Sequence, residues 1–126
     1  MKKIINIKNA PEPVGPYSQA ILYGNTLYSS GQIAIDPKTN NLILDNLEKE
    51  THQVMLNIGA ILDAANMKWE NIIKCSIFLS DMNNFELVNS IYASYFNSSY
   101  PARETVEVAC LPKNVNVEIS FIAIKE

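Results

Sequence analysis

Several signals that would assign a function directly are missing from this chain of 126 residues. It contains no glycine-rich phosphate loop and no dinucleotide-binding fingerprint, so a nucleotide cofactor has no recognisable site. The single histidine, His52, has no second histidine or cysteine nearby at ligand spacing, and we expect it to be a solvated helix residue. A Ser-His-Asp or Cys-His triad would also have to use His52. We therefore expect no cofactor, no metal and no covalent acyl chemistry.

Long apolar segments and paired cysteines are missing as well. No segment approaches the roughly 20 apolar residues needed to span a bilayer, and the N-terminus turns polar too early for a signal peptide. Cys75 and Cys110 lie far apart in the sequence, without the spacing of a zinc or redox motif. These features predict a cytoplasmic protein with no membrane contact and with two reduced thiols.

Basic residues are few and scattered. Ten lysine and arginine residues stand against thirteen acidic ones, which gives a formal net charge of −3. A chain without a basic stripe lacks the electrostatic footprint of a protein that binds phosphate backbones. We therefore do not expect nucleic acid as a main partner.

The pattern of apolar residues predicts an α+β domain. With 48% hydrophobic residues and no repeat or linker, residues 1–126 are expected to form one domain with its own core. Period-two runs and turn signals predict strands at 4–7, 20–23, 26–30, 72–79, 104–109 and 115–124. Apolar spacings of three and four residues predict a helix over about 46–65, and a second helix that starts at Asn83.

Local signals refine these elements. Asp45 with Glu48 is a candidate capping pair for the first helix, and Asn66 can end it with a left-handed φ. Gly24-Asn25 suits a tight hairpin turn. The strand over 72–79 is expected to place Ile73, Cys75, Ile77 and Leu79 on one face, and the stripe of the second helix is expected to comprise Phe85, Val88, Ile91, Tyr92, Tyr95 and Phe96.

The order of these elements predicts a mixed sheet with both helices on one face and the other face open. Ile122 and Ile124 break the polar alternation of the last strand. The open face is therefore expected to be partly buried, most simply by another copy of the chain. We predict a homo-oligomer.

Two residues are candidates for chemistry on their own merits. Arg103 follows a proline turn at the entrance to a strand, where its guanidinium could bind a carboxylate with two parallel hydrogen bonds. The alternative is a surface pair with Glu104 or Glu107. Glu118 lies on the polar side of a strongly apolar strand, where partial burial would raise its pKa and let it position a water. Its alternative is plain solvent exposure.

Six short segments resemble, in order and spacing, the RidA/YjgF family. They are Gly15-Pro16-Tyr17-Ser18-Gln19-Ala20, Ser29-Ser30-Gly31-Gln32-Ile33, Val88-Asn89, Tyr100-Pro101-Ala102-Arg103, Leu111-Pro112-Lys113 and Val117-Glu118-Ile119. The likeness runs from about Asn9 to the last residue. It implies a chorismate-mutase-like α+β fold, assembled as a homotrimer around a central barrel with three ligand clefts between neighbouring subunits.

The resemblance also implies roles for single residues. Arg103 would bind the substrate carboxylate, Glu118 would hold the attacking water, and Tyr17 would lie at the cleft mouth. Ser30 and Gly31 would line the pocket. Without the family, Tyr17 could simply pack over its loop and bond to backbone.

Three further positions need comment. Asn89 matches an asparagine that supports the pocket from the second helix, although a helical asparagine is often just exposed. Thr105 is a substrate-binding candidate at a position where many family members have cysteine. Glu104 could compete for the Arg103 guanidinium, although alternation along a strand sends neighbouring side chains to opposite faces.

The implied activity is hydrolytic deamination of reactive enamines and imines, 2-iminopropanoate and 2-iminobutanoate, to 2-oxo acids and ammonia. A protonated imine is already electrophilic, so its hydrolysis needs orientation and one water. Two other functions stay open. One is an endoribonuclease or translation inhibitor, against which the acidic charge balance argues. The other is a non-catalytic module that binds a small carboxylate.

Overall fold

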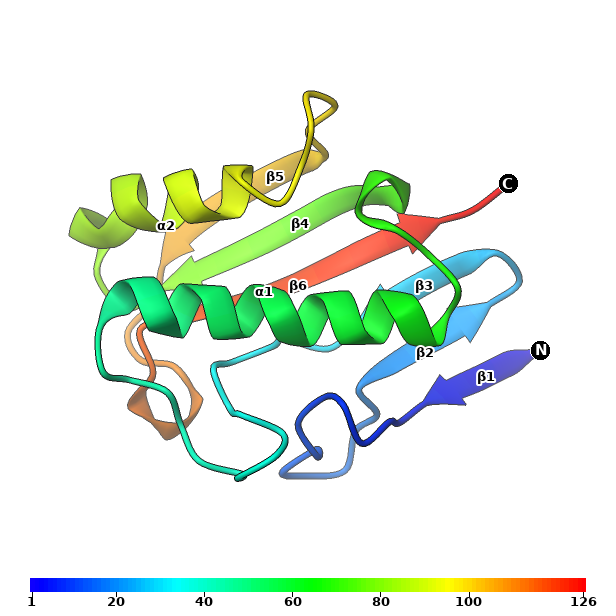
Figure 1. The fold of residues 1–126 in the computed structure, drawn as a ribbon, viewed down its shortest axis with the longest axis horizontal. Coiled ribbons are helices and arrows are strands. Elements are labelled where there is room, and N and C mark those ends of the chain that lie inside the picture. Colours follow the sequence, from blue (N-terminus) through cyan, green and yellow to red (C-terminus); the bar gives the residue numbers. More distant parts are fainter.

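The computed structural model describes residues 1–126 and contains one six-stranded mixed sheet with both α-helices on the same face (Figure 1). The strands are β1 (Lys2–Ile5), β2 (Ala20–Tyr23), β3 (Thr26–Ser29), β4 (Ile72–Leu79), β5 (Ala102–Glu107) and β6 (Val117–Ile124). The helices are α1 (Leu47–Ala64) and α2 (Phe85–Ala93), with short 3-10 helices η1 (Trp69–Asn71), η2 (Met82–Asn84) and η3 (Pro112–Asn114). The predicted α+β class and the one-sided arrangement of the helices are confirmed.

The strand order is β1-β2-β3-β6-β4-β5, and only the β4/β5 pair is parallel. A parallel pair needs a crossover connection, and α2 supplies it. Figure 1 shows α2 beside β5 and β4, while α1 crosses the middle of the sheet. Since β5 is an edge strand, the residues between it and α2 lie at the margin of the molecule.

The hairpin of β2 and β3 forms where Gly24-Asn25 predicted it. Gly24 has a φ of 62°, in the left-handed region that the tight turn requires. The first strand lies two residues earlier than expected, at Lys2–Ile5, because this stretch pairs with β2 in antiparallel register.

The cap of α1 differs from the prediction. Asn46 occupies the N-cap, where its Oδ1 accepts a hydrogen bond from Lys49 N at 2.8 Å. The predicted capping pair at Asp45 is therefore wrong, and the Asp45 carboxylate instead lies 3.6 Å from Lys49 Nζ. Asn66 follows the helix with a φ of 55°, as predicted.

The inner face of α1 packs on the sheet and forms the core. Its buried apolar residues are Val54, Met55, Ile58, Ile61 and Leu62, none more than 1% exposed. They join the inward residues of β6 and β4 in one apolar cluster. The prediction for β4 is wrong at one residue: an irregularity between Ile72 and Lys74 turns Ile72 inward and leaves Ile73 49% exposed.

Two strands also begin at other residues than predicted. β5 begins at Ala102 rather than 104, because its pairing with β4 starts there, so Arg103 lies within the strand. β6 begins at Val117 rather than 115.

The second helix is shorter than predicted. Asp81 caps η2 by accepting a hydrogen bond from Asn83 N, so the helix start expected at Asn83 is wrong and α2 begins at Phe85. The helix ends at Ala93, which leaves Tyr95 and Phe96 of the predicted stripe beyond it.

The face of the sheet away from the helices is uncovered within the chain. Strand register puts Ile4, Tyr28, Val106 and Ile124 on it, each at least 39% exposed. A sheet face with this much apolar area suits a packed contact. Neither helix has the length and apolar character required to cross a membrane.

Candidate functional site

Four of the predicted site residues line one cavity of about 330 Å³, which we name the Glu118 cavity. It lies where the proline-rich loop, the segment after β3 and the beginning of β6 meet. Its lining residues are Pro11, Glu12, Val14, Tyr17, Gln19, Ser30, Gly31, Gln32, Ile33, Ile35, Pro112 and Glu118. Sequence segments separated by about 100 residues thus form one concave surface, which is a usual feature of a small-molecule site.

The Glu118 carboxyl is the only acidic group of this cavity that is partly withdrawn from water. It lies on β6 between the fully buried Val117 and Ile119, and it is half-buried. Burial raises the pKa of Glu118 above its ordinary value. The expected partial burial is confirmed, and plain solvent exposure is not what the structure has.

Gly31 lies directly over this carboxyl group. A Cβ atom at Gly31 would be 2.7 Å from Glu118 Cδ, closer than side chains pack. Two backbone hydrogen bonds hold the segment there, from Gln32 N to Ile119 O at 2.8 Å and from Ile119 N to Gln32 O at 3.1 Å. The close approach that the sequence suggested for Ser30-Gly31 is therefore an approach to Glu118.

Gln19 fixes the proline-rich loop that forms the cavity wall. Its side chain is 2% exposed, and its Oε1 accepts a hydrogen bond from Ile7 N at 2.7 Å. Its Nε2 donates to the carbonyls of Ile7, Ala10 and Pro11 at 3.0, 3.1 and 2.8 Å. A loop rich in proline lacks backbone donors, and one buried amide replaces them.

Tyr17 and Ser30 have local partners as well. The Tyr17 hydroxyl oxygen accepts a hydrogen bond from Val14 N at 3.3 Å, and the ring is 47% exposed. Its hydroxyl proton stays available to a ligand, although the ring also packs over its own loop as the alternative expected. Ser30 Oγ donates to Ser18 O at 2.6 Å, so this hydroxyl ties two cavity segments together.

Arg103 and Asn89 lie in a different cavity, of about 490 Å³, which we name the Arg103 cavity. It opens between α2 and the beginning of β5. Its lining residues are Asn89, Tyr92, Ala93, Tyr100, Pro101 and Arg103. Arg103 is the chain's only arginine.

The Arg103 guanidinium is held on the side of α2. Its Nη1 donates to Asn89 Oδ1 at 2.5 Å, and its Cζ lies over the rings of Phe85 and Tyr92. It forms no ion pair, so the alternative of a surface pair with Glu104 or Glu107 is wrong. A half-buried guanidinium with free N–H groups suits a carboxylate ligand.

Glu104 does not compete for Arg103. It points to the opposite face of the sheet, where it lies 2.8 Å from Lys74 Nζ and accepts a hydrogen bond from Ser76. Hydrogen bonds from Lys74 and Ser76 lower the pKa of the Glu104 carboxyl below its ordinary value. Thr105 shares the face of Arg103, and its Oγ1 is buried without a hydrogen-bond partner.

Within one chain the two cavities do not meet. Arg103 lies on the helix-covered side of β5, in register with the buried Cys75, whereas Glu118 lies on the uncovered side of β6, in register with Phe78. The two cavities share no lining residue. One copy of the chain therefore keeps Arg103 and Glu118 in two separate cavities.

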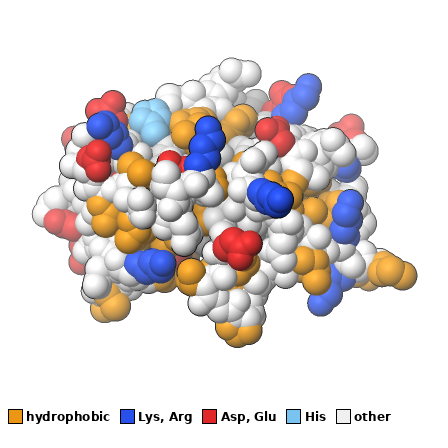
Figure 2. Space-filling model, turned by 60° about the horizontal axis from the view of Figure 1, so that its bottom comes forward, with side chains coloured by type: hydrophobic (Ala, Val, Ile, Leu, Met, Phe, Trp, Pro, Cys, Tyr) orange, Lys and Arg blue, Asp and Glu red, His pale blue; other side chains and the backbone are white.

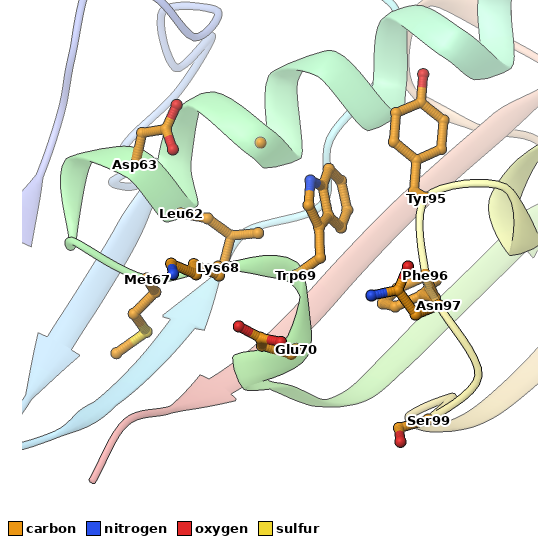
Figure 3. A pocket seen from close by; sticks show the side chains of 11 residues that line it. Leu62, Asp63, Met67, Lys68, Trp69, Glu70, Tyr95, Phe96, Asn97 and Ser99 are labelled. Atoms are coloured by element: carbon orange, nitrogen blue, oxygen red, sulfur yellow. The ribbon is translucent and has the colours of Figure 1, made fainter.

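A third cavity, of about 500 Å³, contains none of the predicted residues. Figure 3 shows Trp69, from η1, and Tyr95, from the segment after α2, next to α1. Its polar lining residues, Asp63, Lys68, Glu70, Asn97 and Ser99, are all exposed. Ligand sites usually have a few polar groups that are partly buried among apolar residues. Because the polar residues of this cavity are all exposed, it is a weaker candidate than the other two.

Three residues with aromatic side chains have contacts that the sequence did not predict. His52 is half-buried, with Nδ1 2.7 Å from the Tyr95 hydroxyl, rather than solvated. Phe85 and Tyr92 were counted only as apolar core residues, although both contact Arg103. Phe85 and Tyr92 lie four residues before and three residues after Asn89, and this spacing places all three on one face of a helix. It was the sequence signal that could have identified them.

Comparison with known proteins identifies the family. Residues 7–125 match the family model described as Endoribonuclease L-PSP. The chain belongs to this family. A RutC family protein from Pyrococcus horikoshii is 51% identical over 126 residues, which cover 100% of both chains. A 2-iminobutanoate/2-iminopropanoate deaminase from Bos taurus is 44% identical over 125 residues, which cover 99% of this chain and 91% of the bovine one.

Solved L-PSP family structures have the same fold. The Rid family protein YyfA from Yersinia pestis superposes with a TM-score of 0.96 at 48% identity, covering 99% of this chain and 100% of that one. TdcF from Escherichia coli, solved with bound serine, gives a TM-score of 0.94 at 35% identity, covering 98% and 99%. The RidA/YjgF resemblance is confirmed.

Proposed function

We propose that this protein hydrolyses reactive 2-imino acids, such as 2-iminopropanoate and 2-iminobutanoate, to 2-oxo acids and ammonia. The observation that carries the proposal is a pair of cavities, which we take as two half-sites: one holds the Arg103 guanidinium without an ion pair, and the other holds the half-buried Glu118 carboxyl, which is suited to hold water. The relative from Bos taurus that is named a deaminase supports the reaction class.

Arg103 binds the carboxylate of the imino acid in this proposal. The hydrogen bond to Asn89 fixes the guanidinium, and its remaining N–H groups face the cavity without a protein partner. A bidentate contact orients the ligand as well as binding it. The Thr105 hydroxyl on the same face also has no partner, but it is fully buried and does not line the Arg103 cavity of a single chain.

Glu118 directs the water. The ionised carboxylate accepts a proton from the water as its oxygen bonds to the imine carbon, and that proton passes to the substrate nitrogen. The resulting adduct carries a hydroxyl group and an ammonium group on one carbon. Its hydroxyl group gives a proton to the Glu118 carboxylate as the C–N bond breaks, which leaves a C=O group and ammonia. Tyr17, at the mouth of the Glu118 cavity, donates a hydrogen bond to the departing nitrogen.

The two half-sites meet between chains in a homotrimer. The uncovered sheet face, with exposed Tyr28, Ile124 and Val106, is the surface that pairs with neighbouring copies. Closing three such faces around a threefold axis buries them together. Each cleft then takes Arg103 from one subunit and Glu118 from the next.

The first experiment is a coupled assay. A threonine dehydratase supplies 2-iminobutanoate, and release of the 2-oxo acid is followed with and without the protein. We expect acceleration by the wild type and by Lys49→Ala, which removes an exposed cation on α1, but none by Arg103→Ala. Failure of the wild type to accelerate release would refute the activity.

A second experiment tests the division of the site between subunits. Arg103→Ala and Glu118→Gln chains are each expected to be inactive. If each cleft combines two neighbours, trimers assembled at random from equal amounts of both have about one quarter of their clefts intact. Recovery to that level is expected, whereas no recovery in verified mixed trimers would contradict a shared cleft.

Two rival functions make different predictions. Figure 2 shows acidic and basic side chains interspersed on the face it presents, with no basic stripe for an RNA backbone. RNA cleavage that survives Arg103→Ala, or that is lost on repurification, would mark a contaminant. Tight binding of a 2-oxo acid without imine turnover would instead favour a carboxylate-binding module.

A further inference from the structure

We propose that Phe85 and Tyr92 are positioning residues for Arg103, and that their ring faces set the affinity of this site for carboxylates. Together with Asn89 they form what we name the guanidinium clamp. The effect on carboxylate affinity rests on the proposed function, whereas the clamp itself lies within one chain.

Two aromatic rings and one hydrogen bond hold the guanidinium in the clamp. Arg103 Cζ lies 5.1 Å from the ring centroid of Tyr92 and 5.6 Å from that of Phe85, both within the roughly 6 Å over which a ring face attracts a cation. The Nη1 atom donates to Asn89 Oδ1 at 2.5 Å, the guanidinium's one hydrogen bond.

Helix geometry brings these three side chains together. Phe85, Asn89 and Tyr92 follow one another at four and three residues along α2, so they share one face of the helix. The parallel register of β4 and β5 turns Arg103 toward that same face. The Tyr92 ring is itself held, at 3% exposure, with its centroid 4.9 Å from that of Phe96.

Such a clamp lowers the conformational entropy that the arginine side chain loses when a ligand binds. A free arginine side chain loses much rotamer freedom when it pairs with a carboxylate. Here the protein has already fixed the guanidinium plane, and the single bond to Asn89 leaves the Nη2 and Nε hydrogens unpaired. The clamp therefore favours two-point binding of a planar carboxylate.

Tyr92 acts through its ring rather than its hydroxyl. Its hydroxyl is buried, lies beside the Cys75 thiol and makes no hydrogen bond to Arg103. Burial raises the pKa of this phenol, which keeps the ring neutral. Removing the hydroxyl should leave carboxylate binding intact, while removing a ring should not.

The test compares Phe85→Leu and Tyr92→Phe with the wild type, and uses Tyr95→Leu as the matched control. Tyr95 is a half-buried aromatic residue after α2 whose ring contacts His52 and Trp69 rather than the guanidinium. The probes are pyruvate and its uncharged amide, pyruvamide, titrated into the assembled protein.

We expect Phe85→Leu to weaken pyruvate binding by about 3- to 30-fold, the effect of losing one partly desolvated cation–π contact, and to leave pyruvamide binding unchanged. In the imine assay the same variant should raise KM with little change in kcat. Tyr92→Phe and Tyr95→Leu should both bind pyruvate within about twofold of the wild type. Equal losses for pyruvate and pyruvamide, or for Phe85→Leu and Tyr95→Leu, would overturn the proposal.

A direct observation separates the clamp from the proposed function. Arg103 is the only arginine, so its side-chain NMR signal is unambiguous. Ring faces should shift that signal upfield in the wild type, and Phe85→Leu should move it toward the free-arginine position. An unshifted wild-type signal would refute the clamp even if deamination is found, and a shifted signal would support it even if pyruvate does not bind.

Discussion

Gly31→Ala should displace the Glu118 carboxyl group and lower activity, while the stability of the fold stays nearly unchanged. A Cβ atom at Gly31 would lie 2.7 Å from Glu118 Cδ, 2.8 Å from Oε2 and 2.9 Å from Cγ. These atoms form the end of a flexible side chain, so the carboxyl group moves rather than the backbone. It must shift by about 1 Å to reach ordinary contact distance.

We expect Gly31→Ala to lower the rate of catalysis. A misplacement of about 1 Å costs on the order of 100-fold in rate, or about 2.7 kcal/mol in the activation free energy. Gly31 does not have a left-handed φ, so alanine is compatible with its backbone, and the free energy of unfolding should change by less than about 1 kcal/mol. The assays are kcat/KM for 2-imino acid hydrolysis and urea-induced unfolding.

Gly15→Ala is the matched control. A Cβ atom there would meet only ring atoms of Tyr17 at 3.7 Å, an ordinary contact. We expect its kcat/KM to stay within a few-fold of the wild type. The reasoning is refuted if Gly31→Ala retains wild-type kcat/KM while Glu118→Gln is inactive, because the position of the carboxyl would then not matter.

Three further predictions follow from individual side chains. Because burial raises the pKa of Glu118, kcat/KM should rise with pH through a pKa above the ordinary carboxyl value, and a wild-type profile without that limb would contradict a role for the ionised carboxylate. Gln19→Leu, which leaves buried backbone groups unpaired, should lower the free energy of unfolding by about 2–4 kcal/mol in urea. The control Ser90→Ala, which loses one exposed hydrogen bond, should lower it by less than about 1 kcal/mol. Thr105→Val removes a buried hydroxyl without a partner, so the variant should unfold at the same temperature as the wild type or higher. If that hydroxyl binds the carboxylate, the variant should also have a higher KM. A lower unfolding temperature would show that Oγ1 has a partner.

Most elements of the fold could be predicted from local sequence signals. The β2/β3 hairpin needed only Gly24-Asn25 between two apolar runs, and α1 needed only a buried stripe with a periodicity of three and four residues. Boundaries were less predictable. Whether Ala102 belongs to β5 depends on its pairing with β4, which local propensity does not encode.

The candidate residues were also recognisable in the sequence, but their arrangement was not. Short segments marked Arg103, Glu118 and Gly31 through family resemblance, and alternation along a strand predicted that Glu104 points away from its neighbour. The sequence by itself thus determined the class of fold, the family and the reactive side chains.

Only the tertiary structure decided which of these residues meet. Sheet order and register put Arg103 and Glu118 on opposite faces, and they place the Gly31 backbone over the Glu118 carboxyl. The α2 crossover brings Phe85 and Tyr92, indistinguishable from core residues in sequence, onto the guanidinium. Such contacts join segments far apart along the chain, so they depend on strand pairing and helix packing rather than on local pattern.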